Sequence, residues 1–321
     1  MTPLKFTLTP LSAFGTPLKG DTLFGQLCWA VAYRFGEARL TELLEGYTEG
    51  RPFAVVSDAF PAGFLPRPAL PLHRYRAVSG ADRKRIKRRR WIPRDDVRRP
   101  LGDWLAHALD DADLAERLGL EGDRPTARRV QPHNTIHRLS GTTGRGEFAP
   151  YGMAQTWYAP GVRLEVYVRF DADRIDAEEI TALLADIGET GYGRDASIGL
   201  GKFAVAASDD APWPGHDDPD AWLTLAPCAP QGSAWEPESC WWQPFTRFGR
   251  HGGTAVQRGR PFKNPVLLAD TGAVLTPRLF EPAASFTGRG LGGDGRLSNA
   301  IAATVHQGYA PVLPVRLEES P

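Results

Sequence analysis

Residues 162–170 read Val-Arg-Leu-Glu-Val-Tyr-Val-Arg-Phe, and apolar and polar side chains alternate through the whole stretch. This period of two predicts a β-strand with one face in a core. Asp176 and Glu179 follow at capping-box spacing, so we expect a helix to begin there. A glycine-rich loop at 191–201 then leads into a predicted strand at 203–206. The segment therefore predicts the order strand, helix, strand.

The same order occurs near the start of the chain. Residues 4–11 alternate like a half-buried strand, and Asp21 is placed to cap a helix that runs to Phe35. A further strand is predicted at 52–57. Two strand–helix–strand units in succession give the split βαβ order of a ferredoxin-like or RRM-like domain.

The predicted first domain, at 1–207, carries a long insertion at about 58–160. Residues 82–99 of this insertion hold ten Arg or Lys against three Asp, although the whole chain is balanced at 38 basic and 38 acidic residues. Residues 101–119 have the pattern of one exposed acidic helix, with Trp104 on its apolar side. Positive charge is therefore concentrated in particular segments such as 82–99, and these segments are the candidates for a surface that binds a polyanion.

A Pro/Asp linker is expected at 208–219, and a second domain at 220–321. We expect the second domain to be β-rich and to lack a convincing helix, which makes the whole chain α+β. The predicted short strands are at 221–226, 239–248, 264–269 and 312–317.

The composition excludes several classes of protein. The cysteines, Cys28, Cys228 and Cys240, are odd in number and form no CxxC pair, which argues against a disulfide framework and a structural zinc site. The first residues lack a signal-peptide layout, and no stretch approaches about 18 uninterrupted apolar residues. We therefore expect a soluble, cytoplasmic protein without a membrane span, a metal or a cofactor.

The loop at 191–202 begins GYGRDA, which matches G-x-G-x-x-A in letters only. A dinucleotide-binding loop follows a strand and opens a helix, whereas this loop follows a predicted helix and opens a strand, so we reject that function. The loop is either a plain glycine turn or a backbone that approaches RNA closely. In the second case its glycines are Gly191, Gly193, Gly199 and Gly201, and its donors to phosphate or ribose are Arg194, Ser197 and Lys202.

Two further segments carry charge that suits an anion. Lys19 directly precedes a predicted helix start, where free N–H groups attract anions, although an ordinary capped helix also explains it. The basic run at 83–90, followed by Trp91, suits a nucleic-acid backbone, with Arg85 and Arg88 as candidate contacts. We interpret the run as an arm that orders on binding or, alternatively, as a solvated face.

The segment 133–138, His-Asn-Thr-Ile-His-Arg, is polar and charged. A preceding proline and two β-branched residues disfavour the helix that a zinc pair of His133 and His137 would need. Acid–base cleavage of RNA by a histidine is an alternative, and so is a loop without a role. We favour RNA contact through Asn134 and Arg138.

In the second half, residues 245–253 alternate aromatic and basic side chains and include Arg250 and His251. Base stacking combined with phosphate contacts would use such a strip, and a surface strand and loop explain it equally well.

Several segments, taken together and in order, resemble one family. They are FGTPLKGDTLFGQLCWA (14–30), SDAFPAGFLPRP (57–68), HNTIHRLSGTTG (133–144), GYGRDASIGLGKF (191–203), RFGRHGG (247–253) and PFKNPV (261–266). They resemble the RAMP-superfamily subunits that bind the 5′ tag of the guide RNA in type III-A CRISPR effectors, the fourth subunit of the Csm complex. The glycine loop alone indicates only the broad RAMP superfamily, whereas the first two segments are more specific.

The resemblance implies two RRM-like domains packed face to face, with a β-hairpin thumb formed by either the run at 83–90 or residues 133–150. Such a subunit grips the guide RNA's repeat-derived 5′ tag, contacts the large polymerase-nuclease subunit and a backbone RAMP subunit, meets target RNA only indirectly, and is not a nuclease. The RNA-binding residues implied are Lys19, His133, Asn134, Arg138, Arg194 and Ser197, with Arg250 and His251 in support.

Three other functions stay open at this point. A RAMP endoribonuclease that matures guide RNA would use His133 or His137 as acid or base. The chain is alternatively the equivalent tag-binding subunit of a type III-B or type I complex, or an RNA-binding adaptor outside CRISPR systems.

Overall fold

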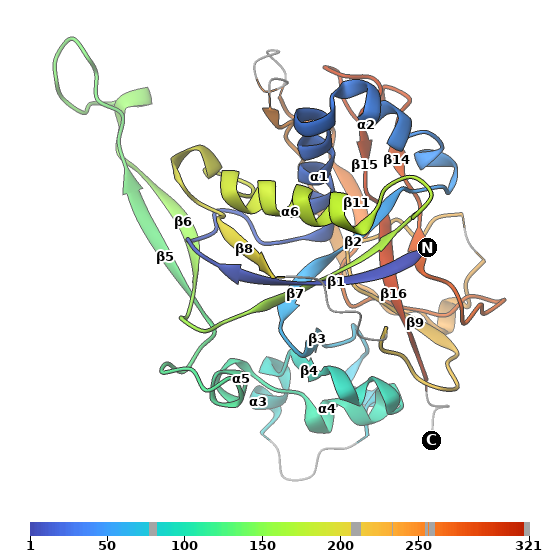
Figure 1. The fold of residues 1–321 in the computed structure, drawn as a ribbon. Helices are drawn as coiled ribbons and strands as arrows, with labels where there is room; N and C mark the ends of the chain where they lie inside the picture. The colour runs from blue at the N-terminus through green and yellow to red at the C-terminus, as the bar shows by residue number, and fades with distance from the viewer. Residues whose placement is uncertain (77–81, 207–212, 233, 254–255, 257–260, 318–321) are drawn as a thin grey trace.

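The computed structural model describes residues 1–76, 82–206, 213–232, 234–253, 256 and 261–317. Figure 1 shows a body of packed sheets and helices, from which one long hairpin projects. The predicted linker at 208–219 lies outside the described residues as far as residue 212.

The first half is built on a four-stranded antiparallel sheet in the order β2-β7-β1-β8, and helices α1 and α6 cover one face of it (Figure 1). Phe6 of β1 pairs with Val166 of β7, and both side chains are fully buried in the core beneath the helices. The chain order of these elements confirms the two predicted strand–helix–strand units. The bounds are β1 (Thr2–Pro10), α1 (Gly20–Phe35), α2 (Glu37–Leu43), β2 (Ala54–Pro61), β7 (Leu164–Phe170), α6 (Ala177–Thr190) and β8 (Phe203–Ala206).

The two long helices begin in different ways. The predicted capping box of α6 is confirmed: the Asp176 carboxylate accepts from the backbone N–H of Glu179 at 2.7 Å, and Glu179 accepts from that of Asp176 at 3.1 Å. The predicted cap of α1 at Asp21 is wrong, because Lys19 occupies the N-cap position. Asp21 lies in the first turn, where its carboxylate binds the distant Arg247.

Strand β7 is buried on both faces, whereas its alternation predicted one buried face. Glu165 and Tyr167 are only 5% and 1% exposed. The Glu165 carboxylate lies 3.4 Å from Lys5 Nζ and 3.1 Å from a guanidinium nitrogen of Arg94, and it accepts from the Tyr167 hydroxyl at 2.9 Å. Because the insertion and the second half cover this face, its polar groups are satisfied inside the protein.

The part of the insertion before the hairpin folds as a small packed unit. The predicted single exposed helix at 101–119 is wrong, because two short helices form, and Asp110 caps the second by accepting from two backbone N–H groups at 3.0 Å. Trp104 is fully buried, and its indole donates to the Arg99 carbonyl at 3.0 Å. The elements are β3 (Phe64–Pro66), α3 (Arg83–Arg88), β4 (Trp91–Pro93), α4 (Trp104–His107) and α5 (Asp111–Arg117).

A two-stranded hairpin follows, formed by β5 (Thr126–His133) and β6 (Tyr151–Tyr158), and it extends away from the body (Figure 1). Thr126 pairs with Tyr158 at the base and His133 with Tyr151 at the far end. Of the two segments considered for a β-hairpin thumb, residues 133–150 close this hairpin, whereas the run at 83–90 contains helix α3.

The second half is β-rich, as predicted. Its largest sheet has the order β12-β9-β16-β13, and the described residues between 213 and 317 include no α-helix. A second ferredoxin-like domain therefore stays a prediction. The strands are β9 (Ala221–Thr224), β10 (Pro244–Arg247), β11 (Val266–Ala269), β12 (Val274–Leu275), β13 (Phe286–Gly288), β14 (Leu291–Gly292), β15 (Val305–His306) and β16 (Tyr309–Val315).

Candidate nucleic-acid interface

The glycine loop at 191–202 packs directly against the loop that precedes α1. The Tyr192 side chain is fully buried, and its hydroxyl donates to the Pro17 carbonyl at 2.8 Å and accepts from the Lys19 N–H at 3.2 Å. The N–H of Gly201 donates to the Ala13 carbonyl at 2.8 Å. Two segments that are far apart in the sequence therefore form one continuous surface.

The glycines of this loop are required by its packing. The backbone of all four predicted positions has positive φ, from 75° to 99°. A Cβ at Gly201 would lie 2.1 Å from the Tyr192 carbonyl oxygen, and one at Gly193 would lie 2.8 Å from Thr16 Cβ. Only Gly199 among the four has open space around it, so the loop is chiefly a compact support.

Three side chains predicted to bind RNA point outward from this support. Arg194, Ser197 and Lys202 are all exposed. A terminal nitrogen of Arg194 donates to the Ala154 carbonyl of β6 at 2.6 Å, and Nε lies 3.3 Å from the Asp195 carboxylate. Arg194 therefore joins the glycine loop to the hairpin, while Ser197 and Lys202 remain outward donors.

One face of the hairpin combines basic and aromatic side chains. The register places Arg129, His133, Tyr151 and Trp157 on the same face, because cross-strand partners and alternate residues share a side. The Arg129 guanidinium lies 5.9 Å from the centre of the Trp157 ring, and the His133 ring stacks on Tyr151 at 5.6 Å. We call these four residues the hairpin face.

Sequence reasoning found only His133 of the hairpin face. The missed residues are Arg129 on β5, which has no buried residue, and Tyr151 and Trp157 on β6, which has one, so neither strand shows an apolar alternation toward a core. The available signal was weaker: in YGMAQTWY (151–158), Tyr and Trp occur at positions of equal parity.

The tip of the hairpin carries the other predicted contacts. Asn134 and Arg138 are exposed there. His137 Nδ1 lies 3.0 Å from the Ser140 hydroxyl, and its ring packs edge-on against Phe148 at 4.8 Å, so this histidine stabilises the turn. Nowhere in the described part of the chain do three His, Cys, Asp or Glu residues gather as a metal site.

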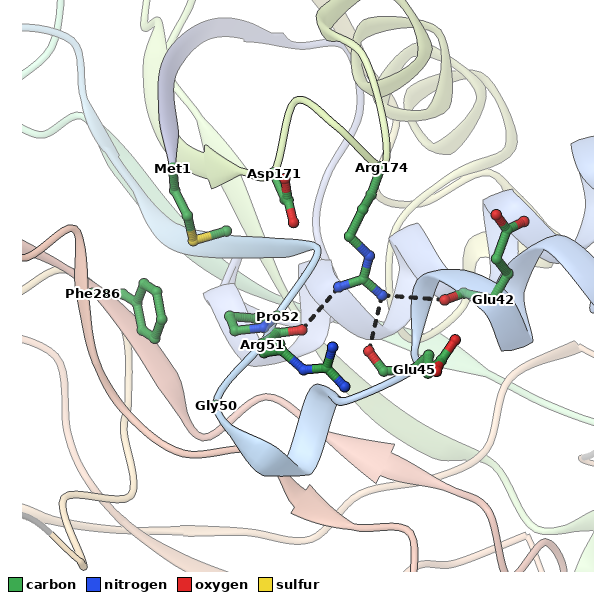
Figure 2. Close-up of a pocket in the computed structure, with 9 residues that line it drawn as sticks. All are labelled: Met1, Glu42, Glu45, Gly50, Arg51, Pro52, Asp171, Arg174 and Phe286. Atoms are coloured by element: carbon green, nitrogen blue, oxygen red, sulfur yellow. Dashed lines mark hydrogen bonds between the residues drawn. The ribbon is translucent and has the colours of Figure 1, made fainter.

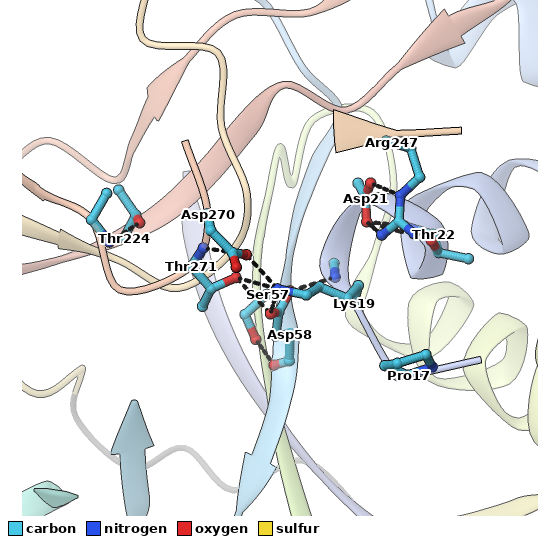
Figure 3. A network of polar contacts seen from close by, with 12 residues as sticks. Pro17, Lys19, Asp21, Thr22, Ser57, Asp58, Thr224, Arg247, Asp270 and Thr271 are labelled. Atoms are coloured by element: carbon cyan, nitrogen blue, oxygen red, sulfur yellow. Dashed lines mark hydrogen bonds and ion pairs between the residues drawn. The ribbon is translucent and has the colours of Figure 1, made fainter. Parts of the chain in front are cut away.

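Lys19 lies between the two halves of the protein and not at an open anion site. Figure 3 shows its ammonium group among acidic side chains, at 3.1 Å from Asp58 and 2.5 Å from Asp270. Burial alone would lower the pKa of Lys19, but these two carboxylates raise it above its ordinary value. The positive charge is therefore already neutralised inside the protein.

A second ion cluster lies beside the first (Figure 3). Arg247 donates to both carboxylate oxygens of Asp21, at 2.6 and 2.7 Å, and His306 Nε2 lies 3.4 Å from the same carboxylate. Burial raises the pKa of Asp21, but His306 and Arg247 outweigh it and hold the pKa well below its ordinary value. Both clusters join the first half to the second.

The remaining predicted residues divide between exposed and internal positions. Arg85 and Arg88, both on α3, are exposed, but Arg85 lies 2.7 Å from the Asp113 carboxylate. Arg250 is exposed with its guanidinium over the Phe262 ring at 5.8 Å. His251 is buried, with Nε2 at 2.7 Å from the Ser298 hydroxyl.

An open pocket of about 380 Å³ lies on another part of the surface, beside α2 and the start of β1 (Figure 2). Arg174 lines it, but this guanidinium donates to the carbonyls of Arg51 at 2.9 Å, Glu42 at 3.2 Å and Glu45 at 3.0 Å. The arginine therefore caps the end of α2, and no predicted site residue lines the pocket. As for membranes, none of the helices described is long and apolar enough to span one.

No protein-family model and no curated protein matches the sequence. Solved structures do match along the whole chain. A chain of a Csm3–Csm4 subcomplex from the type III-A CRISPR–Cas interference complex aligns with a TM-score of 0.62 at 13% identity, covering 98% of this chain and 99% of that one. A chain of a Csm1–Csm4 cassette in complex with cA4 aligns with a TM-score of 0.59 at 16% identity, covering 99% and 100%. The protein therefore has the fold of a Csm4 subunit.

Proposed function

We propose that this chain is the non-catalytic subunit of a type III-A CRISPR effector that binds the 5′ tag of the guide RNA. The observation that carries the proposal is the fold shared with Csm4 chains from end to end, together with the hairpin face and the adjoining glycine loop. The effector is a cytoplasmic antiviral ribonucleoprotein, and target RNA reaches this subunit only through the guide.

The geometry of the hairpin supports binding of single-stranded RNA. Exposed Trp157 and Tyr151 offer ring faces for stacking, and Arg129 adds a cation beside them. Asn134 and Arg138 at the tip supply donors for base edges and phosphates, as Ser197 and Lys202 do at the glycine loop. An unpaired RNA strand lying along this surface would therefore contact aromatic rings, on which its bases stack, and cationic side chains, which bind its phosphates.

The same proposal gives the chain two protein partners, a large polymerase-nuclease subunit and a backbone RAMP subunit. Matched chains come from crystals of Csm1–Csm4 and Csm3–Csm4, so each of these partners is one that a protein of this fold binds. The two ion clusters between the halves support a bridging role, because they hold the two halves together.

Binding of labelled tag RNA to the purified full-length chain tests the proposal. Replacing Trp157 with Ala should weaken binding about tenfold, because one base–aromatic stack contributes about 1–3 kcal/mol. Trp242→Ala is the matched control, since Trp242 is 45% exposed against 42% for Trp157 but lies in the second half. Equal affinities of both variants and the wild type in fluorescence polarisation would remove the hairpin face from the RNA path.

The endoribonuclease alternative makes a different prediction. Metal-free incubation of the wild-type chain with repeat RNA should leave the RNA intact if the subunit only binds. Cleavage that His137→Ala abolishes would replace the proposed function by that of a guide-maturing nuclease.

A further inference from the structure

Helix α3 presents four cations on its outward side: Arg83, Lys84, Lys87 and Arg88. Arg83 and Lys87 form one pair at i, i+4 spacing, and Lys84 and Arg88 form another. Like charges at this spacing on a helix repel each other. All four are exposed, and within the described ranges none has an ion pair or a side-chain hydrogen bond. The free protein thus keeps an unneutralised positive face that destabilises its own helix.

The opposite side of α3 is firmly anchored. Ile86 packs against the core of the insertion, and Arg85 binds Asp113 of α5 at 2.7 Å. Arg89 donates to the Leu105 carbonyl at 2.9 Å. Arg67 donates to the carbonyls of Ile86 and Arg89, at 3.1 and 2.8 Å. These contacts hold the outward face in a fixed orientation.

Other cations of the same basic run are neutralised within the protein. Arg90 binds Asp111 at 2.6 Å, Arg94 binds Glu165 at 3.1 Å, and Arg99 binds Asp96 at 2.9 Å. Within the described residues these arginines have carboxylate partners, two in the insertion and one on β7, whereas the outward cations of α3 have none. Of the ten cations at 82–99, four have carboxylate partners, and the four outward cations of α3 have none among the described residues.

We infer that the outward face of α3 binds the phosphates of an RNA strand, as a second contact region separate from the hairpin face. The inference rests on the proposed RNA-binding function and extends it to a part of the insertion. An RNA backbone fits better than a protein surface, because the four positions carry charge and no apolar side chain, and lysine is depleted from protein interfaces.

The test uses the full-length chain and a fluorescein-labelled single-stranded RNA that carries the 5′ tag. The test variant replaces the four outward cations of α3 with Gln, which preserves helix propensity while removing four charges. The control variant removes four exposed cations elsewhere, so that net charge is equal. Its substitutions are Arg34→Gln, Arg278→Gln, Arg289→Gln and Arg296→Gln.

Affinity is measured from 50 to 300 mM salt. Each phosphate contact on a single strand adds about 0.7 to the steepness of the plot of log K against log[salt]. Because the α3 variant lacks four cations, this slope should become shallower by about 2 to 3 units. The variant should also bind the RNA at least about tenfold more weakly. The control should keep the wild-type slope. A slope within 0.5 of wild type for the α3 variant would overturn the inference but leave the proposed function intact.

Two other results would also decide the matter. If the wild-type chain does not bind the RNA, both the proposed function and this inference fail together. If the α3 variant keeps the wild-type slope but no longer co-purifies with the large or backbone subunit, the face binds an acidic protein and the RNA assignment is wrong.

Discussion

Strand β7 and the hairpin face both place polar and aromatic side chains on antiparallel β-structure, yet only one of them is open to a ligand. On β7, Glu165 and Tyr167 are buried, and Lys5 and Arg94 bind the carboxylate. On the hairpin, Trp157 stays 42% exposed. A polar or aromatic pattern on a strand therefore marks a binding surface only when no other part of the chain covers it.

The comparison bears on where the proposed RNA ligand would lie. In RRM domains the open face of the sheet carries the aromatic side chains that stack on bases. Here the corresponding side of the first sheet is covered by the insertion and by β16. We therefore expect RNA at the projecting hairpin and the glycine loop, while the sheet face serves to hold the halves together.

The largest expected effect is at the buried face. Glu165→Gln removes the charge that Lys5 and Arg94 share, and breaking a buried ion pair costs about 3–5 kcal/mol. Urea unfolding should therefore show a loss of about 3 kcal/mol in the free energy of unfolding.

The control for this variant is an exposed ion pair of similar geometry. Arg34 lies 2.8 Å from Asp186, and both side chains are more than 40% exposed. Asp186→Asn should change stability by less than about 1 kcal/mol. Equal effects of the two substitutions would show that the β7 face is solvated and accessible, against the comparison made above.

Several predictions that depend on neighbouring residues were correct, whereas several that depend on contacts between distant parts of the chain were wrong. The strands and helices of the first sheet were predicted because their periodicity and the Asp176 capping box are local. Lys19 looked like a free cation at a helix start because one of its partners, Asp270, lies 251 residues away. The helix predicted at 101–119 failed because Asp110 caps a new helix in the middle of that stretch.

The surface residues were harder to predict for a related reason. Strand β5 has no buried residue and β6 has only one, so no hydrophobic period marks them. The basic run at 83–90 was recognised as a charged segment, but nothing in its residue pattern distinguished Arg85 from Arg88. Only the fold separates them, because it places Asp113 beside Arg85 and leaves Arg88 outward.

Acid pH is expected to have an intermediate effect on stability, because it protonates Asp21 at the junction of the two halves. The pKa of Asp21 is held below its ordinary value, so its pairing with Arg247 stabilises the fold fully above about pH 4 and is lost as the pH falls through the folded-state pKa. Each unit of pKa lowering corresponds to about 1.4 kcal/mol. Urea unfolding between pH 5 and 3 should show a steeper loss of stability for the wild type than for Asp21→Asn. Parallel pH curves would show that the Asp21 cluster does not hold the halves together.

The smallest expected effect on stability is at the hairpin face, and it completes the comparison. Trp157→Ala removes a ring whose cation–π contact with Arg129 is exposed, and such a contact contributes about 0.5–1 kcal/mol. The free energy of unfolding should therefore fall by less than about 1 kcal/mol, even though RNA binding by the same variant should weaken about tenfold. On an open binding face, a side chain is expected to contribute strongly to RNA affinity and little to the free energy of unfolding. A loss of more than 2 kcal/mol would instead place Trp157 in the core, and the contrast between the hairpin and β7 would disappear.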